Sequence, residues 1–233
     1  MSNDQLSNPI ATALNAVRQR LAESEKEYAR VPGSVQLLAV SKTHDAEKVR
    51  AAYAAAQRQF AENYLQEALD KMTVLPADII WHFIGPIQSN KTRPLAERFD
   101  WVHTVDREKV ARRLDEQRPP DRPPLNVLLQ VNVSDETSKS GVSLDELPAL
   151  AAVVSTLPRL ALRGLMAIPA PATSFEAQRQ AFRQLAEARA ALLAQGYPGC
   201  TELSMGMSQD MEAAIAEGAT MVRIGTDIFG KRG

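Results

Sequence analysis

The sequence has few of the residues that mark several common protein classes. It contains one cysteine, Cys200, which excludes an intrachain disulfide and a thiolate zinc site and which we expect to be a small buried hydrophobe. Its three histidines do not stand at metal-ligand spacing, so no metal site is predicted. With 11 glycines and 14 prolines the chain is not of low complexity. These shortages leave an ordinary globular protein in a reducing compartment.

Charge of one sign and long apolar runs are also lacking. The chain has 27 basic and 28 acidic residues, a formal charge of −1, which offers no basic footprint for nucleic acid. No segment reaches the ~18 consecutive apolar residues of a membrane helix. Residues 1–6 have neither the basic stretch nor the apolar segment of a signal peptide. We therefore expect a soluble, cytoplasmic protein that binds neither nucleic acid nor membrane.

What the sequence does contain is a regular alternation of strand and helix patterns. Each of eight apolar runs is followed by helical spacing, and residues 37–40 are continuously apolar, as parallel strands covered on both faces are. The eight predicted strands lie near residues 35–41, 58–61, 79–84, 100–104, 125–133, 160–167, 202–205 and 221–225. This predicts one α/β domain over residues 1–233, a (β/α)8 TIM barrel. A doubly wound open sheet is the alternative, without a Gly-x-Gly-x-x-Gly turn to support it.

Some helices and loops have boundaries that can be assigned from the sequence. An amphipathic pattern over residues 10–21 predicts a helix before the first strand that covers one end of the fold. Ser143 and Glu146 have the spacing of a capping box that opens a helix. A long helix is expected over residues 175–196. The proline-rich stretch 118–124 is predicted to be a loop within the domain.

In a barrel, functional residues gather at the carboxyl ends of the strands. Lys42 directly follows the first apolar strand and should project into the barrel mouth, where an unpaired ammonium is costly. Desolvation and nearby cations lower the pKa of such a lysine and leave neutral amine that can attack a carbonyl and form a Schiff base. The alternative is a structural lysine that snorkels or pairs with Glu62.

Small and hydroxyl-bearing residues end the seventh and eighth strands. Gly225 lets the backbone approach a ligand, and the hydroxyls of Ser204, Ser208 and Thr226 can donate hydrogen bonds near two predicted helix starts, as in a phosphate cradle. The alternative is that Ser208 and Thr226 are N-caps and Gly225 a turn residue. A reactive amine beside a phosphate cradle describes a ligand with both a carbonyl and a phosphate, such as pyridoxal phosphate (PLP) or a phosphorylated sugar.

Arg223 favours PLP over a sugar. A guanidinium is always protonated and only donates hydrogen bonds, so against a pyridine nitrogen it would keep that nitrogen unprotonated and make the ring a weak electron sink. Such a site holds the cofactor but activates it poorly. The alternative is an ion pair of Arg223 with Asp210 or Asp227.

Several motifs stand out along nearly the whole chain: Leu38-Ala-Val-Ser-Lys-Thr43, Glu62-Asn-Tyr-Leu-Gln-Glu67, Trp81-His-Phe-Ile-Gly-Pro-Ile-Gln-Ser-Asn-Lys91, Gln130-Val-Asn-Val133, Lys139-Ser-Gly141, Gly164-Leu-Met-Ala167, Ser204-Met-Gly-Met-Ser-Gln-Asp210 and Val222-Arg-Ile-Gly-Thr226. Together they resemble the pyridoxal 5'-phosphate homeostasis protein family (YggS/PROSC). Ala61 departs from the family, which usually has glycine there. The resemblance implies a barrel similar to the N-terminal domain of alanine racemase, with PLP as cofactor.

The resemblance also implies site residues and their roles. Lys42 stands where the family has its Schiff-base lysine, Arg223 stands near the pyridine nitrogen, and Asn63 lies beside the ring. The positions that match the family's phosphate-binding residues are Ser204, Ser208, Gly225 and Thr226.

The function that the resemblance implies is non-catalytic binding of PLP, which supports vitamin B6 and amino-acid or keto-acid homeostasis. Its partners would be PLP and PLP-dependent apoenzymes or B6-synthesising enzymes. The sequence adds a reason to doubt catalysis, because an alanine racemase takes its second base from a separate β-domain, and Gly233 follows soon after the eighth strand. Without the dimer contacts of that domain, a monomer is expected. A PLP-dependent racemase, a Schiff-base aldolase and, last, an interaction module are the alternatives.

Overall fold

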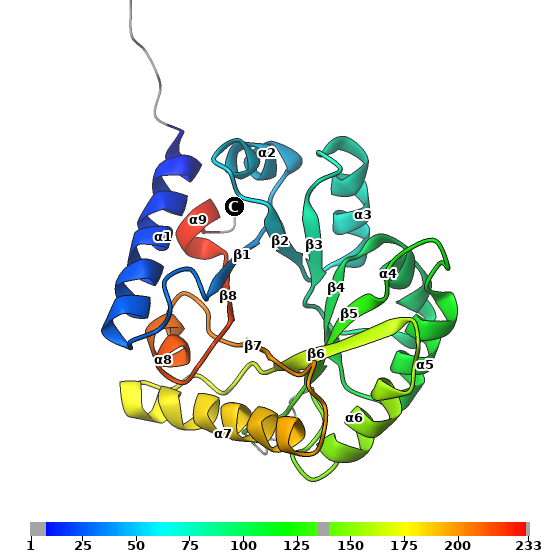
Figure 1. Cartoon of the computed structure of the whole chain (residues 1–233). Coiled ribbons are helices and arrows are strands. Elements are labelled where there is room, and N and C mark those ends of the chain that lie inside the picture. Colours follow the sequence, from blue (N-terminus) through cyan, green and yellow to red (C-terminus); the bar gives the residue numbers. More distant parts are fainter. Residues whose placement is uncertain (1–7, 135–139, 232–233) are drawn as a thin grey trace, which may run out of the picture.

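The eight apolar runs form eight parallel strands that close into a barrel in the computed structural model, which describes residues 8–134 and 140–231 (Figure 1). Each strand pairs with the next along the chain, and β8 pairs with β1 to close the sheet. The strands are β1 (Gln36–Val40), β2 (Gln59–Glu62), β3 (Ile80–Phe83), β4 (Trp101–Val105), β5 (Leu125–Gln130), β6 (Leu160–Met166), β7 (Glu202–Ser204) and β8 (Met221–Ile224). The predicted barrel is confirmed, and the open sheet is excluded.

Helices ring the barrel, and side-chain caps set where several of them begin. The carboxylate of Asp45 accepts the Lys48 N–H at the start of α2, and the Ser174 hydroxyl accepts the Ala177 N–H at the start of α7. The helices are α1 (Pro9–Glu27), α2 (Ala46–Ala54), α3 (Leu65–Val74), η1 (Ser89–Lys91), α4 (Thr92–Arg98), α5 (Glu108–Gln117), α6 (Leu147–Ser155), α7 (Phe175–Ala194), α8 (Met211–Ala216) and α9 (Thr226–Phe229). Within the described residues, no helix has the length and apolar character needed to span a membrane.

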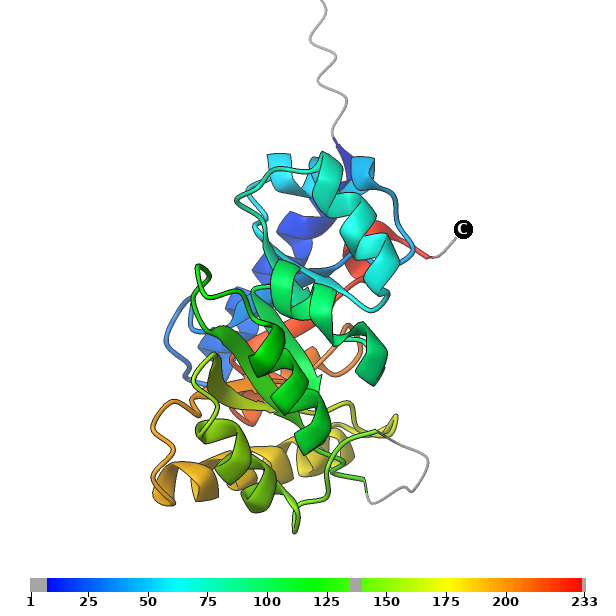
Figure 2. The same ribbon diagram turned by 90° about the vertical axis from the view of Figure 1, so that its right-hand side faces the viewer.

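The position of α1 differs from the expectation. It does not cover an end of the barrel but lies in the outer ring of helices, between α8 and α2 and against α9 (Figures 1 and 2). The reason is that α9 has only four residues and is too short to cover the seam between β8 and β1. The buried face of α1, formed by Leu14, Val17 and Leu21, fills that place in the helix layer.

The predicted capping box forms, but the helix begins later than expected. The Ser143 hydroxyl lies 2.8 Å from Glu146 Oε2, and the Glu146 N–H donates to Ser143 Oγ across 3.2 Å. These bonds close a turn, and α6 begins at Leu147. Pro148 explains the offset, because proline is tolerated only in the first turn of a helix. Residues 118–124 are a loop, as predicted, and Lys139 of the motif Lys139-Ser-Gly141 lies outside the described residues.

The sheet separates two apolar clusters. The larger one fills the space between strands and helices. The smaller one lies inside the barrel and consists of Leu38, Val40, Ala61, Ile84, Leu128, Met166 and Met221, with Trp101 packed against it. Side chains alternate along a strand, so residues two positions from these also point inward. By this rule Gln59, His82, His103 and Arg223 give the barrel interior a polar layer.

Candidate functional site

A pocket of about 340 Å³ lies at the carboxyl ends of the strands. Six of the seven residues predicted from the sequence line it: Lys42, Asn63, Ser208, Arg223, Gly225 and Thr226. The rest of the wall comes from apolar residues of β1 and the β3 end, from the loops after β6 and β7, including Ile168, Pro169 and Met207, and from Gln178 of α7. Segments far apart in the sequence thus meet at one end of the barrel, as the fold requires.

The backbone around Lys42 is held in an unusual conformation. Lys42 is half-buried and follows β1 after Ser41, and Thr43 has a φ of +63°. This left-handed region is costly for a β-branched residue. The Thr43 N–H donates to Glu67 Oε2 across 2.9 Å, which ties the strained turn to α3. The strand end and this bond together set the direction in which Lys42 leaves the sheet.

Glu62 forms its ion pair with Lys71 rather than with Lys42. Lys71 Nζ lies 2.7 Å from Glu62 Oε1 and 2.7 Å from the carbonyl oxygen of Ser41, and the Ser41 hydroxyl donates to the same carboxylate oxygen across 2.6 Å. Burial raises the pKa of Glu62, although the Lys71 ammonium opposes that shift. The carboxylate that the sequence offered as a structural partner for Lys42 is therefore engaged beneath the pocket.

The loops after β7 and β8 are shaped by two glycines. Gly206 has a φ of +92°, and a Cβ placed there would lie 2.5 Å from Ala214 Cβ. A Cβ on Gly225 would lie 3.1 Å from the carbonyl oxygen of Val40, a tight contact, so a larger residue there would push this loop away from β1.

The hydroxyls of these loops are not helix caps. Asp210 occupies the N-cap position of α8, and Gly225 occupies that of α9. Ser208 precedes the first of these caps, and Thr226 is the first residue of α9. The alternative that explained both hydroxyls as N-caps is thus wrong, and both residues line the pocket instead.

Arg20 of α1 joins the two loops from behind. Its guanidinium donates to Glu212 of α8 at 2.7 and 3.1 Å, to Asp227 of α9 at 2.9 Å and to the carbonyl oxygen of Ser208 at 2.8 Å. This role could not be predicted from the sequence, because an amphipathic pattern shows which face of a helix is apolar and not what its polar face contacts. Asp227, engaged here, is not the partner of Arg223.

Arg223 is buried at the floor of the pocket. It donates two hydrogen bonds within the protein, from Nη1 to Ser204 Oγ at 2.7 Å and from Nη2 to the carbonyl oxygen of Ala167 at 3.0 Å. Burial lowers the pKa of Arg223 to about 10, and the charge of Asp210 opposes the shift. Asp210 therefore acts on Arg223 through its charge, while its Oδ1 accepts the Met207 N–H at 2.6 Å.

Ser204 does not line the pocket, in contrast to its predicted role as a phosphate donor. It is the last residue of β7, fully buried, and lies below the pocket against Arg223 and His103. The sequence prediction counted Ser204 among the residues of the mouth, but Ser204 is still part of β7. Its hydroxyl contacts Arg223 and His103 inside the barrel rather than pointing into the mouth.

Two histidines that looked scattered in the sequence meet inside the barrel. His82 Nδ1 lies 2.9 Å from His103 Nε2, and both side chains are fully buried. Burial lowers the pKa of His82 to about 3, and burial, with smaller effects of His82 and Arg223, holds the pKa of His103 well below its usual value. Both imidazoles are therefore neutral. No group of three metal-ligating side chains occurs in the described part of the chain.

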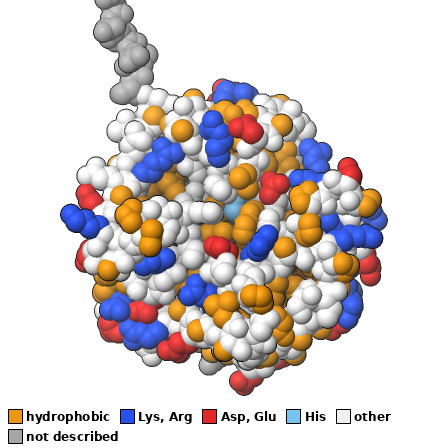
Figure 3. All heavy atoms as spheres, viewed as in Figure 1, with side chains coloured by type: hydrophobic (Ala, Val, Ile, Leu, Met, Phe, Trp, Pro, Cys, Tyr) orange, Lys and Arg blue, Asp and Glu red, His pale blue; other side chains and the backbone are white. Residues whose placement is uncertain are grey.

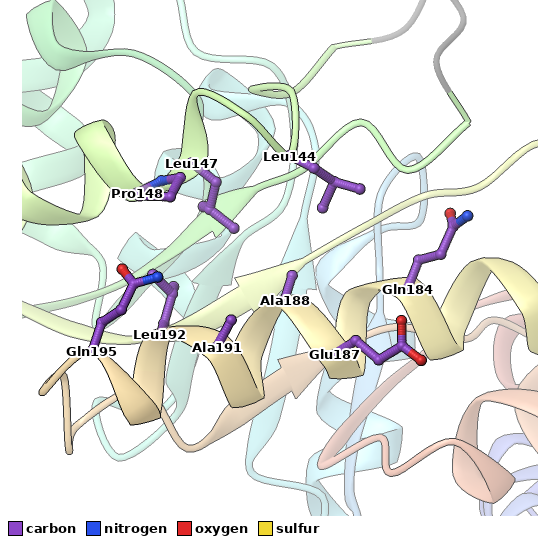
Figure 4. Close-up of a pocket in the computed structure, with 9 residues that line it drawn as sticks. All are labelled: Leu144, Leu147, Pro148, Gln184, Glu187, Ala188, Ala191, Leu192 and Gln195. Carbon is purple, nitrogen blue, oxygen red and sulfur yellow. The ribbon is translucent and has the colours of Figure 1, made fainter.

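A second hollow lies between α6 and α7 (Figure 4). Leucine, alanine and glutamine line most of it, and Glu187 is its one ionisable residue among those described. Figure 3 shows basic and acidic side chains interspersed around the rim of the face that it views. The hollow between α6 and α7 does not combine an amine with anion-binding groups, whereas the mouth pocket does, so the mouth pocket is the candidate site.

Known proteins match this chain over almost its full length. A family model for the N-terminal domain of alanine racemase matches residues 13–233. The pyridoxal phosphate homeostasis protein of Pseudomonas aeruginosa is 59% identical to this chain, and the match covers 96% of both chains. The protein of the same name from Escherichia coli is 54% identical, and that match covers 97% of both chains.

A solved structure agrees with these matches. The structure of PipY from Synechococcus elongatus with PLP bound superposes with a TM-score of 0.81, and its sequence is 41% identical. The match covers 95% of this chain and 100% of PipY. The chain belongs to the pyridoxal phosphate homeostasis protein family. The family predicted from the motifs is thereby confirmed.

The homeostasis protein family shares its barrel with alanine racemase. The alanine racemase of Corynebacterium glutamicum is 18% identical with a TM-score of 0.69, and the match covers 96% of this chain and 60% of the racemase. At this identity the likeness concerns the fold alone. In the present chain, Ala61 is fully buried in the inner cluster, so its extra methyl group, compared with glycine, packs inside the barrel.

Proposed function

We propose that this protein binds PLP in the mouth pocket and serves PLP homeostasis without catalysing a reaction of its own. The observation that carries the proposal is the shared pocket of Lys42, Arg223 and the glycine-hydroxyl loops. A primary amine, a buried guanidinium and hydroxyl donors are the groups that an aldehyde, a pyridine nitrogen and a phosphate require. The relatives named for PLP homeostasis, and PipY with PLP bound, support the same ligand.

The pocket also has unused polar capacity that fits such a ligand. Asn63 Oδ1 is buried at the pocket and has no hydrogen-bond partner among the residues that the structure describes. A buried acceptor without a partner costs about 1–3 kcal/mol, which a bound ligand with a donor would recover.

Each of the predicted site residues then has a distinct role. When bound, PLP supplies an aldehyde that condenses with a primary amine. Lys42 provides that amine, and an incoming amine can replace it by exchange. Ser208, Gly225 and Thr226 bind the phosphate, Arg223 donates to the ring nitrogen, and Asn63 lies beside the ring. Ser204, predicted as a phosphate ligand, acts instead through Arg223.

The absence of catalysis is supported by the ionisable groups at the pocket. Among the described lining residues, only Lys42, Asp210 and Arg223 are ionisable, and no tyrosine, histidine or cysteine faces the ligand site. A racemase needs a second acid/base group opposite the lysine. Arg223 always carries a proton and keeps the ring a weak electron sink. We also propose a monomer that exchanges PLP with apoenzymes or B6-synthesising enzymes.

Asp210 is the one observation that favours a racemase as second candidate. It lines the pocket, and burial raises its pKa, as is common for a proton-transferring carboxylate. Its Oδ1, however, accepts the Met207 N–H. An amino-acid turnover assay with free L- and D-alanine decides the question, since measurable racemisation that Asp210→Asn abolishes would establish catalysis.

The decisive experiment is a visible absorption spectrum of the purified protein, followed by borohydride reduction and peptide mapping. We expect a yellow protein whose reduced adduct maps to Lys42. Lys42→Ala should lose the covalent link and the wild-type chromophore while keeping weak, phosphate-anchored binding. A colourless protein that takes up no added PLP would overturn the proposal, as would a Lys42→Ala variant with the full chromophore. A phosphosugar adduct on Lys42 would point to an aldolase.

A further inference from the structure

The polar layer inside the barrel forms one continuous chain of hydrogen bonds. It starts at Arg223 on the pocket floor and passes through Ser204, His103 and His82 to Gln59. The distances are 2.7 Å from Arg223 Nη1 to Ser204 Oγ, 2.9 Å from Ser204 Oγ to His103 Nδ1, 2.9 Å from His103 Nε2 to His82 Nδ1, and 2.6 Å from His82 Nε2 to Gln59 Oε1. Besides β8, which carries Arg223, the strands β7, β4, β3 and β2 each contribute one residue to this chain of hydrogen bonds.

The chemistry of Arg223 sets the direction of every bond in this chain. A guanidinium has five N–H donors and no acceptor, so Ser204 Oγ must accept from it and direct its own hydrogen elsewhere. The atom within reach is His103 Nδ1, which is therefore the acceptor. A neutral imidazole that accepts at Nδ1 carries its hydrogen at Nε2. His103 then donates to His82 Nδ1, and by the same rule His82 Nε2 donates to the amide oxygen of Gln59.

Burial and stacking hold this arrangement. Ser204, His82 and His103 are fully buried, so a broken bond could not be replaced by water without opening the barrel. The Trp101 ring stacks on His82 with centroids 5.5 Å apart and an interplanar angle of 14°, which fixes the plane of that imidazole. The other end of the guanidinium is bound to the carbonyl oxygen of Ala167. Hydrogen bonds thus hold the Arg223 guanidinium on two sides, and its remaining N–H groups can donate into the pocket that it lines.

We propose that Ser204, His103 and His82 are positioning residues, which hold Arg223 as a fixed hydrogen-bond donor at the pocket floor through a chain of bonds that all run in one direction. A ligand whose acceptor meets this guanidinium finds it already oriented and loses less entropy on binding. That this acceptor is the ring nitrogen of PLP rests on the proposed function. The direction of the chain does not, because it follows from the two ends of the chain, where Arg223 can only donate and Gln59 Oε1 can only accept.

The direction can be measured by nuclear magnetic resonance of the full chain, labelled with ¹⁵N-histidine and stripped of PLP. We expect the imidazole ¹⁵N shifts of His82 and His103 at pH 7.5 to be those of neutral rings with hydrogen at Nε2. Hydrogen at Nδ1, or an imidazolium, on either residue would overturn the chain. In Ser204→Ala, His103 Nδ1 loses its donor, so its ¹⁵N shift should move while that of His82 moves less.

The consequence for binding is tested with the same variant. We expect Ser204→Ala to bind PLP about tenfold more weakly and to shift the absorption maximum of the bound cofactor, since the guanidinium is no longer fixed. His103→Gln, which keeps one donor and one acceptor, should lose less affinity. Thr92→Val is the matched control, because Thr92 is a fully buried, hydrogen-bonded hydroxyl on α4 outside the pocket. It should lose stability without a change in affinity or spectrum.

The outcomes separate this inference from the proposed function. Wild-type affinity and spectrum in Ser204→Ala would overturn the positioning role. An equal loss of affinity in Thr92→Val would also overturn it, since the effect would then be one of general stability. If the wild type takes up no PLP, the proposed function fails, and the histidine shifts still decide whether the chain exists.

Discussion

Lowering the pH from 7.5 to 5.5 should destabilise this protein mainly through His82 and His103. Both are buried as neutral rings, with the pKa of His82 near 3 and that of His103 well below its usual value. In the unfolded chain a histidine has a pKa of about 6.5. Below that pH the unfolded chain therefore binds more protons than the folded one, so the stability that is fully present at pH 7.5 is lost as the pH falls.

The size of the effect follows from proton linkage. Over this pH range each histidine that stays neutral in the folded state lowers the free energy of unfolding by roughly 1 kcal/mol, and the pair by about 2 to 3 kcal/mol. Glu62, whose pKa is raised by burial, acts in the opposite direction, because its folded form takes up a proton first. This contribution is common to wild type and histidine variants and cancels in their difference.

The assay is reversible urea unfolding of the wild type, His82→Gln and His103→Gln at both pH values. Each variant should lose about 1 kcal/mol less than the wild type between pH 7.5 and 5.5, whatever its stability at pH 7.5. The comparison of slopes thus separates proton uptake from loss of packing. If the variants lose as much as the wild type, the two histidines titrate normally in the fold, and the reasoning about their neutral state is refuted.

Four further predictions concern the site and its surroundings. Thr226→Ala should weaken PLP binding about ten- to a hundredfold by fluorescence titration, because a hydrogen bond to a charged group contributes roughly 1.5–3 kcal/mol; unchanged affinity would remove its phosphate role. Arg20→Met should lower PLP affinity a few-fold, since the two loops lose their shared tether, but cost only about 1 kcal/mol in urea unfolding because its ion pairs are partly exposed. Lys71→Met should cost about 3–5 kcal/mol by leaving Glu62 buried without its cation, and adding Glu62→Gln should recover part of it in a double-mutant cycle; strictly additive losses would contradict a coupled pair. Cys200, buried and with its pKa raised to about 11 by desolvation, should react with a disulfide reagent only after unfolding.

The barrel could be predicted from the sequence because its signal is local. Each strand is a short apolar run closed by turn residues, and both faces are covered, so the pattern needs no knowledge of its neighbours. The pocket at the mouth could be located for the same reason, since Lys42 and Thr226 each lie two residues beyond the end of a strand. The place of α1 could not, because it depends on how short α9 is and therefore on what the ring of helices still lacks.

The polar layer in the interior was missed because it depends on register between strands. His82 pairs with Trp101 in the sheet, and His103 lies two residues further along β4, so the two imidazoles meet only once this pairing is known. Ser204 was assigned to the mouth for a related reason, because a hydroxyl suits a phosphate. As the last residue of β7, it instead lies below the pocket, inside the barrel. Residue type predicted the chemistry at the mouth, and strand register decided which residues reach it.

The interior of a barrel is usually filled by branched apolar side chains, so a polar layer there needs a physical reason. Here the cost of burial is limited because each donor in the chain meets an acceptor and both histidines are neutral. The one charge, on Arg223, stands at the end of the chain nearest the pocket, where a ligand acceptor can compensate it. An apolar layer would have been simpler to pack but would have left the guanidinium free to turn. The polar layer is therefore explained by the need for a fixed cation at the floor of the site, and it makes affinity sensitive to residues that no ligand touches.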